Sequence, residues 1–84
     1  MYEYYFTFRS MTRAQLAVQR LKGRGIEAEL VRIPKSIATT GCGYAVRLQS
    51  AAAYPASAAL HAAGIEFERA FGLTPDGHAK EVPL

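Results

Sequence analysis

The residue in this sequence whose side chain could do the most chemistry is its only cysteine, Cys42. It lies between two glycines in the run Thr39-Thr40-Gly41-Cys42-Gly43. A cysteine thiolate is a good nucleophile, and positive charge nearby lowers the pKa of the thiol. Flanking glycines let backbone amides turn toward a thiolate or its adduct. Arg32 and Lys35 are the cations closest in sequence. The pattern predicts a thiol site in which the amides around Thr40, Gly41 and Gly43, together with Arg32 and Lys35, stabilise an anion.

Cys42 also has a structural interpretation. Free cysteine is among the residue types most often buried, and here it directly precedes an apolar strand. A single cysteine beside glycine is a weak signal, so the residue pattern alone favours the structural interpretation. A third hypothesis is a loop that binds an anion or a small ligand without covalent chemistry.

Other polar residues give weaker signals for a site. His61 and His78 could act as bases or ligands, but two histidines and one cysteine at irregular spacing predict no metal site. Arg9, Ser10, Thr12 and Arg13 could hold an anion at a helix start, although ordinary helix capping with two surface arginines is the favoured explanation. No catalytic triad, carboxylate pair or cofactor motif can be assembled.

The composition limits the class of protein. The chain has 84 residues, of which 50% are hydrophobic and 20% are charged, as expected for one globular domain. The net charge is +3 with acidic residues mixed through the chain, which does not predict a nucleic-acid partner. No apolar run approaches the ~20 residues that span a membrane. The absence of a signal-peptide pattern and the single thiol favour the cytoplasm.

Hydrophobic periodicity predicts four strands and two helices. The first helix begins at Ser10 or Thr12 and the second at about Pro55, after a turn over 51–54; glycines end both helices. The strands are expected at residues 2–8, 27–33, 44–48 and 65–71, the loop at 34–41, and an irregular tail at 72–84.

This order, βαββαβ, predicts a single α+β domain over residues 1–71. We expect a ferredoxin-like split βαβ arrangement, in which two helices cover one face of a four-stranded antiparallel sheet. Its two halves echo each other, since Gly25-Ile26-Glu27 and Gly64-Ile65-Glu66 both follow a helix. The uncovered face invites a partner or a homodimer. It would carry Tyr5, Thr7, Val31, Ile33, Ala45 and Arg47.

The topology constrains what can help Cys42. We expect the first and third strands to run parallel, with each helix starting at their C-terminal ends. Cys42 would then lie near the helix C-termini, away from the end whose dipole favours an anion. Arg47 lies on the other face of the strand and is excluded as a direct partner. The tail with His78 is expected on the Cys42 side.

Several of these residues together resemble a known family. The segments Phe8-Arg9-Ser10, Gly25-Ile26, Ile33-Pro34-Lys35-Ser36-Ile37 and Gly41-Cys42-Gly43-Tyr44-Ala45-Val46-Arg47 are similar to those of small bacterial selenium/sulfur carrier-like proteins, over roughly residues 4–71. The resemblance implies that Cys42 accepts sulfur or selenium as a persulfide or perselenide. It also implies a donor enzyme, for example a cysteine desulfurase, and an acceptor protein, so the chain would be a carrier more than an enzyme with turnover. The alternative is a non-catalytic interaction or regulatory module that dimerises through its open sheet face, with Cys42 structural.

Overall fold

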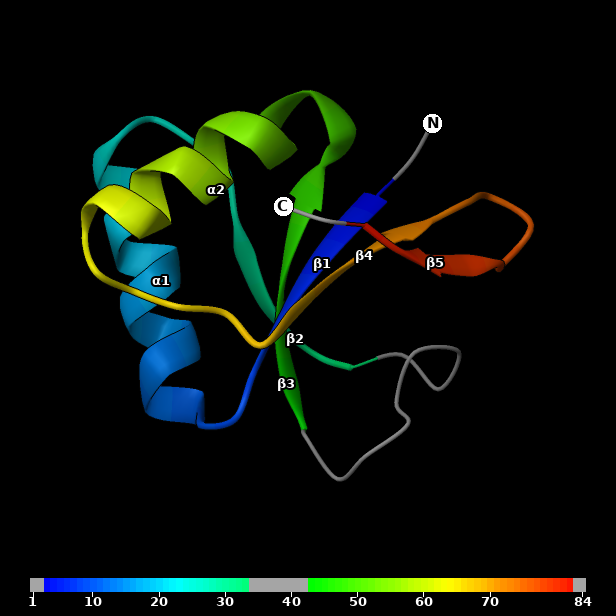
Figure 1. The fold of residues 1–84 in the computed structure, drawn as a ribbon, viewed down its shortest axis with the longest axis horizontal. Coiled ribbons are helices and arrows are strands. Elements are labelled where there is room, and N and C mark those ends of the chain that lie inside the picture. The colour runs from blue at the N-terminus through cyan, green and yellow to red at the C-terminus, as the bar shows by residue number, and fades with distance from the viewer. Residues whose placement is uncertain (1–2, 34–42, 83–84) are drawn as a thin grey trace.

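A computed structural model describes residues 3–33 and 43–82 of the chain, which form two helices and a five-stranded sheet. Figure 1 shows both helices on one side of the strongly twisted sheet. In chain order the elements are β1 (Glu3–Phe8), α1 (Met11–Gly23), β2 (Glu29–Arg32), β3 (Tyr44–Gln49), the 3-10 turn η1 (Ser50–Ala52), α2 (Ala53–Ala62), β4 (Arg69–Leu73) and β5 (Ala79–Glu81).

The sheet has the strand order β2-β3-β1-β4-β5, and every neighbouring pair is antiparallel. The predicted α+β class with two helices and an antiparallel sheet is confirmed, but the sheet has five strands and not four. The extra strand, β5, forms within the segment that was predicted to be irregular. It returns along β4 after a turn in which Thr74 N donates to His78 O at 2.9 Å and Gly77 adopts a φ of 90°.

The first and third strands run antiparallel, which corrects the prediction that they are parallel. Phe8, at the end of β1, pairs with Tyr44 at the start of β3, and Glu3 pairs with Gln49. The physical reason is in the connections. A helical crossover leaves β2 running in the direction of β1, and the following connection to the adjacent strand β3 reverses the chain.

The main core lies between the sheet and the helices. Its largest fully buried side chains are Phe6, Phe8, Leu21, Val46, Leu48 and Leu60. Phe6 also stacks on Phe67, from the segment before β4, with ring centroids 4.4 Å apart. These apolar contacts fix the helices on one face, since burial of apolar area is the dominant stabilising term in a domain of this size.

Both helices end in the same hydrogen-bonded turn. Gly25 and Gly64 have φ values of 76° and 73°, a region in which only glycine is unstrained. Ile26 N donates to Leu21 O and Ile65 N donates to Leu60 O, each at 2.9 Å. These are the bonds of the Schellman motif, in which an apolar residue after the glycine packs back on the last turn. The predicted echo between the halves is therefore a shared helix-ending structure.

The helix starts differ. Ser10 caps α1, because its Oγ accepts from Arg13 N at 3.2 Å. The helix α2 has no side-chain cap and begins at Ala53, two residues before the predicted start at Pro55. Proline is tolerated there because the amides of the first helical turn have no intrahelical acceptor.

Candidate functional site

The structure describes only part of the predicted thiol site. Cys42, Gly41, Thr40 and Lys35 lie outside the described residues, whereas Arg32 and Gly43 lie within them. The geometry of the site can therefore be described only for the two strand ends that flank the segment 34–42.

These two flanks are neighbours at one end of the sheet. Ile33 N donates to Gly43 O at 3.2 Å, and Arg32 pairs with Tyr44 in the β2–β3 register. Arg32 and Gly43 are both exposed to solvent. The structure thus brings together these two predicted site residues, although they are far apart in sequence.

The start of α1 lies at this same end of the sheet. Tyr44 pairs with Phe8, which is followed after one residue by the cap Ser10. Gly43 therefore lies at the end of the sheet where α1 begins, and the prediction that the N-terminal ends of the helices lie on the opposite side of the domain is wrong for α1. It failed because it rested on parallel first and third strands. The positive end of the α1 dipole therefore lies at the Gly43 end of the sheet, where it favours an anion.

His78 lies on the opposite side from the one predicted. Strand β4 ends at Leu73, which pairs with Glu3 and with Ala79. His78 lies in the turn beyond Leu73, where its amide donates to Thr74 Oγ1 at 3.2 Å. Because β4 runs antiparallel to β1, it ends far from Gly43, and His78 is not placed to fold over the flanks of the thiol segment.

Gly43 is not required by the fold of the described residues. A Cβ atom added to it would meet no atom within 4 Å, and its φ is outside the positive region. At Gly25 and Gly64, in contrast, the backbone itself demands glycine. Neither packing nor backbone strain explains why a glycine follows Cys42.

Arg47 is held by two carboxylates. Its Nη2 lies 2.5 Å from Glu29 Oε2 and its Nη1 lies 3.8 Å from Glu3 Oε2. The hydrogen bond with Glu29 and the charge of that carboxylate raise the pKa of Arg47. Tyr5, which pairs with Arg47 across the sheet, donates its hydroxyl to Glu3 at 3.2 Å. Burial, and then the charge of Glu3, raise the pKa of Tyr5.

The face of the sheet away from the helices is more buried than the sequence suggests. Tyr5, Thr7 and Ala45 expose 4% or less of their surface within a single chain. Partly buried side chains pack against Tyr5 and Ala45, namely Val31, Ile33, Phe71, Leu73 and Ala79. Those three predicted open-face residues are therefore not available as an apolar surface.

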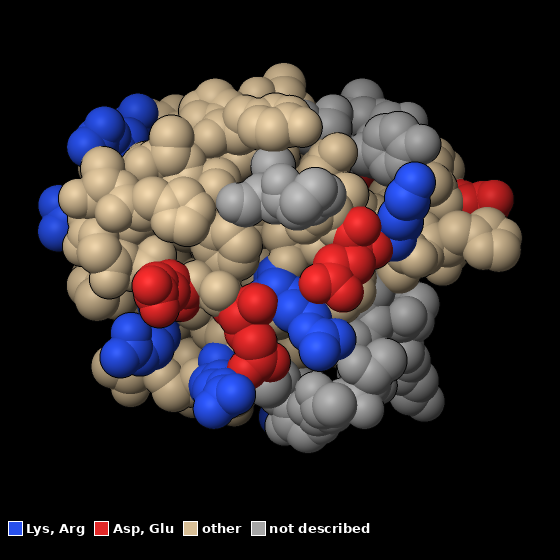
Figure 2. Space-filling model, viewed as in Figure 1, with Lys and Arg blue, Asp and Glu red and all other residues tan. Residues whose placement is uncertain are grey.

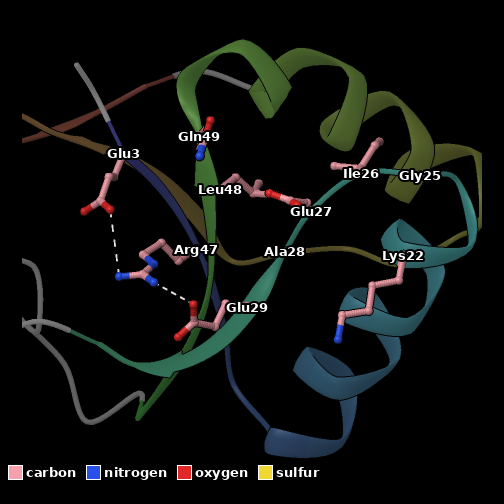
Figure 3. A pocket seen from close by; sticks show the side chains of 10 residues that line it. All are labelled: Glu3, Lys22, Gly25, Ile26, Glu27, Ala28, Glu29, Arg47, Leu48 and Gln49. Atoms are coloured by element: carbon pink, nitrogen blue, oxygen red, sulfur yellow. Dashed lines mark hydrogen bonds and ion pairs between the residues drawn. The ribbon is translucent and has the colours of Figure 1, made fainter.

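A pocket of ≈650 Å³ lies between the end of α1 and the edge of the sheet, and the sequence did not predict it. Figure 3 shows Arg47 between Glu3 and Glu29 on one side of the pocket. Lys22 of α1 lies on the other side of the pocket. Its lining is completed by Gly25, Ile26, Glu27, Ala28, Leu48 and Gln49. The sequence signal that could have indicated this pocket is the group of charged residues around the helix-ending Gly25. Because it adjoins the end of β3, this pocket is separate from the Gly43 flank.

Residues 3–33 and 43–82 contain neither a metal cluster nor a membrane-spanning helix. No group of three or more His, Cys, Asp or Glu side chains there could hold a metal ion. None of the helices in this part of the chain has the length and apolar character needed to cross a membrane.

The fold and the site define a small α+β protein with a cysteine-bearing segment between two antiparallel strands of its sheet. Residues 3–71 match the model of the family described as "Putative Se/S carrier protein-like", and the chain belongs to this family. The resemblance drawn from the sequence is confirmed. Comparison with curated proteins and with solved structures gave no match.

Proposed function

We propose that this protein is a sulfur or selenium carrier that uses Cys42 to accept the transferred atom. Membership of the Se/S carrier-like family over residues 3–71 is the observation that carries this proposal. The geometry of the flanks supports it, since the hydrogen bond between Ile33 and Gly43 anchors both ends of the Cys42 segment beside the start of α1.

The transfer needs no external oxidant or reductant. The Cys42 thiolate attacks the outer sulfur of a persulfide on the donor, and the sulfur–sulfur bond of the donor breaks. The donor cysteine leaves as a thiolate, and a new sulfur–sulfur bond joins the transferred atom to Cys42. A perselenide donor reacts in the same way at its outer selenium. An acceptor thiolate then attacks the outer atom on Cys42 and regenerates the Cys42 thiolate.

Positive charge and backbone amides at this end of the sheet suit an anionic adduct. Arg32 and Lys35 supply charge, and the backbone amides around Thr40, Gly41 and Gly43 donate hydrogen bonds. The exposed position of Arg32 beside the Ile33–Gly43 pair supports its part in this set. The N-terminal end of α1 adds a partial positive charge on the same side.

The proposal extends to the partners and the setting of the carrier. The donor is an enzyme that forms a persulfide or perselenide, for example a cysteine desulfurase, and the acceptor is a second protein. Because a persulfide requires a free thiol, the carrier works in a reducing compartment such as the cytoplasm. The arrangement βαββαβ, to which β5 is added at the edge, is a ferredoxin-like split βαβ fold.

Mass spectrometry after incubation with a small-molecule persulfide donor tests the function. We expect the intact protein to gain the mass of one sulfur atom, the gain to disappear on treatment with a thiol reductant, and the Cys42→Ser variant to gain nothing. An Arg32→Gln variant should load more slowly at neutral pH, because the thiol pKa rises when a nearby cation is removed.

The same experiment separates the carrier from the alternative functions. A thiol that neither accepts sulfur nor reacts with iodoacetamide in the folded protein would exclude the carrier. If that protein also sediments as a dimer, the result would favour an interaction or regulatory module in which Cys42 is structural. Anion or small-ligand binding that survives Cys42→Ser would favour the non-covalent hypothesis.

A further inference from the structure

The charges of this protein are divided unevenly between its helices and its sheet. Residues 10–26 and 50–65, which contain both helices, include no Asp or Glu. All seven acidic residues of the chain lie elsewhere, in or beside the strands and their loops. The α1 segment, however, carries Arg13, Arg20, Lys22 and Arg24. The net positive charge therefore resides on α1, since the other six basic residues are outnumbered by the seven acidic ones.

Three of these cations form one stripe on α1. Arg13, Arg20 and Arg24 recur at helical spacing, and Leu16 lies beside them on the same side of the wheel. All four are exposed, Leu16 to 48%. No ion pair or side-chain hydrogen bond joins any of the three guanidinium groups to another described residue, whereas Arg9 and Arg47 both have carboxylate partners. Figure 2 shows basic side chains along the left edge of the molecule, the side on which Figure 1 places α1.

Helix stability does not explain this stripe. Cations near a helix C-terminus interact favourably with the helix dipole, which accounts for Arg20 and Arg24. Arg13, however, lies in the first turn, where a positive charge is unfavourable and where α1 has no acidic residue. Leu16 is not among the residues of the core cluster, to which α1 contributes Ala14, Ala17, Val18 and Leu21.

A shallow hollow lies on the same surface. It has a volume of ≈270 Å³ and is lined by Leu16, Gln19, Arg20, Gly23 and Arg24. Gly23 leaves this space open, since no atom lies within 4 Å of where its Cβ would be. An apolar contact with Leu16 is thus framed by two guanidinium groups that pair with no carboxylate of the described residues.

We propose that the stripe Arg13, Leu16, Arg20 and Arg24 is the docking surface for an acidic segment of a partner protein. One apolar side chain of the partner fills the hollow against Leu16, and its carboxylates pair with Arg20, Arg24 and Arg13. Arginine suits this task because its planar guanidinium group binds carboxylates in a bidentate way. Such a surface steers the encounter and fixes the orientation of the partner. It does not depend on the chemistry of Cys42.

The observations favour a protein over a nucleic acid as the partner. A phosphate backbone would need several cations spread along a track, and three arginines around an exposed leucine give only a short one. Exposed apolar side chains among arginines are typical of protein interfaces, in which arginine and aromatic or long apolar residues are enriched.

Binding of synthetic peptides to the full-length protein tests this inference. The probe is a fluorescein-labelled peptide of repeating Asp-Glu-Leu. It is compared with an Asn-Gln-Leu analogue, an Asp-Glu-Ser analogue and a labelled DNA duplex. We expect the acidic apolar peptide to bind most tightly and to shift the backbone amide resonances of residues 13–24. Cys42→Ser should bind it equally well, which separates docking from sulfur transfer.

Matched variants locate the binding surface. Arg20→Glu should weaken peptide binding by about tenfold or more, because an attraction becomes a repulsion. Lys80→Glu makes the same charge change on β5 and should alter binding by about twofold at most. Leu16→Ser should weaken it by about fivefold through loss of the apolar contact.

Three results would overturn the proposal. The first is equal weakening by Arg20→Glu and Lys80→Glu, which would indicate attraction to the net charge alone. The second is a set of shifted resonances that lies outside residues 13–24. The third is tighter binding of the DNA duplex than of the acidic peptide, which would assign the surface to nucleic acid.

Discussion

The two halves of the chain use the same backbone device and present different surfaces. In each half a strand leads into a helix that ends at a glycine with positive φ, and the next residue is an isoleucine whose amide bonds back to a buried leucine. Yet α1 and its C-cap carry four cations, Arg13, Arg20, Lys22 and Arg24, whereas α2 carries no Asp, Glu, Lys or Arg. The fold therefore constrains the residues at the ends and on the buried faces of the helices. The residues on the outer faces are less constrained and can differ according to what each face binds.

The largest expected effect comes from the buried leucines that the halves share. Leu21 and Leu60 are both 0% exposed, and each lies one turn before its helix-ending glycine. Leu21→Ala and Leu60→Ala should each lower the free energy of unfolding by about 2–5 kcal/mol, measured by urea denaturation. Leu16→Ala, on the exposed side of α1, should change it by about 0.5 kcal/mol or less. Costs for Leu21 and Leu60 that differed several-fold would show that the halves are not energetically equivalent.

The glycines at the helix ends come next. Gly25→Ala and Gly64→Ala should each cost about 1–2 kcal/mol, because a Cβ atom is strained at positive φ. Gly23 provides the control within two residues, since it is helical and its added Cβ would meet no atom. Gly23→Ala should stabilise the protein by about 0.5–1 kcal/mol. Thermal unfolding of the three variants measures this, and a destabilised Gly23→Ala would contradict the assignment of the helix end.

The helix starts are where the halves differ. Ser10→Ala removes the only side-chain cap that the two described helices have, and should cost about 1 kcal/mol. Ser10→Asp should keep the stability that Ser10→Ala loses, because a carboxylate accepts the same hydrogen bond and complements the helix dipole. Chemical denaturation distinguishes these outcomes. If the aspartate variant is as unstable as the alanine variant, the Ser10 side chain does not cap α1.

The smallest effect concerns Tyr5 on the second face of the sheet. Because burial raises its pKa above the ordinary value of 10.0, the unfolded chain loses the phenolic proton first as the pH rises. The stability that comes from keeping this phenol neutral is present below about pH 10 and lost as the pH rises through the folded pKa. Tyr5→Phe should therefore weaken the decline in stability as the pH rises above about 10. At pH 7 it should cost about 1 kcal/mol or less, the value of the hydrogen bond to Glu3. Denaturation of both proteins across this pH range measures the difference, and identical profiles would show that Tyr5 does not titrate differently on folding.

Local signals in the sequence predicted most of the elements. The alternation around Phe6 and the helical spacing of Ala14, Ala17, Val18 and Leu21 follow directly from which side chains the core buries. The glycine–isoleucine pairs predicted both helix ends, because a positive φ and an apolar residue after it are local requirements. Strand β5 was missed because Ala79–Glu81 is three residues long and has no apolar alternation.

The relations between elements were harder to predict than the elements. The direction of β3 relative to β1 depends on two connections together, and no single residue signals it. That error also misplaced His78 and the start of α1 relative to Gly43. The pairing of Arg47 with Glu29 and Glu3 likewise joins three separate strands and has no signature in any one of them. The arrangement around Cys42 itself stays a prediction.

The hydrogen bond between Ile33 and Gly43 has a consequence for how such proteins can diversify. This bond joins the residue before segment 34–42 to the residue after it, and so extends the β2–β3 pairing up to both ends of the segment. A segment spliced between bonded strand ends can be lengthened cheaply, since doubling its length costs only about 0.6 kcal/mol in closure entropy. The length and sequence of residues 34–42 can therefore be changed, by evolution or by grafting, while the strands on either side are kept.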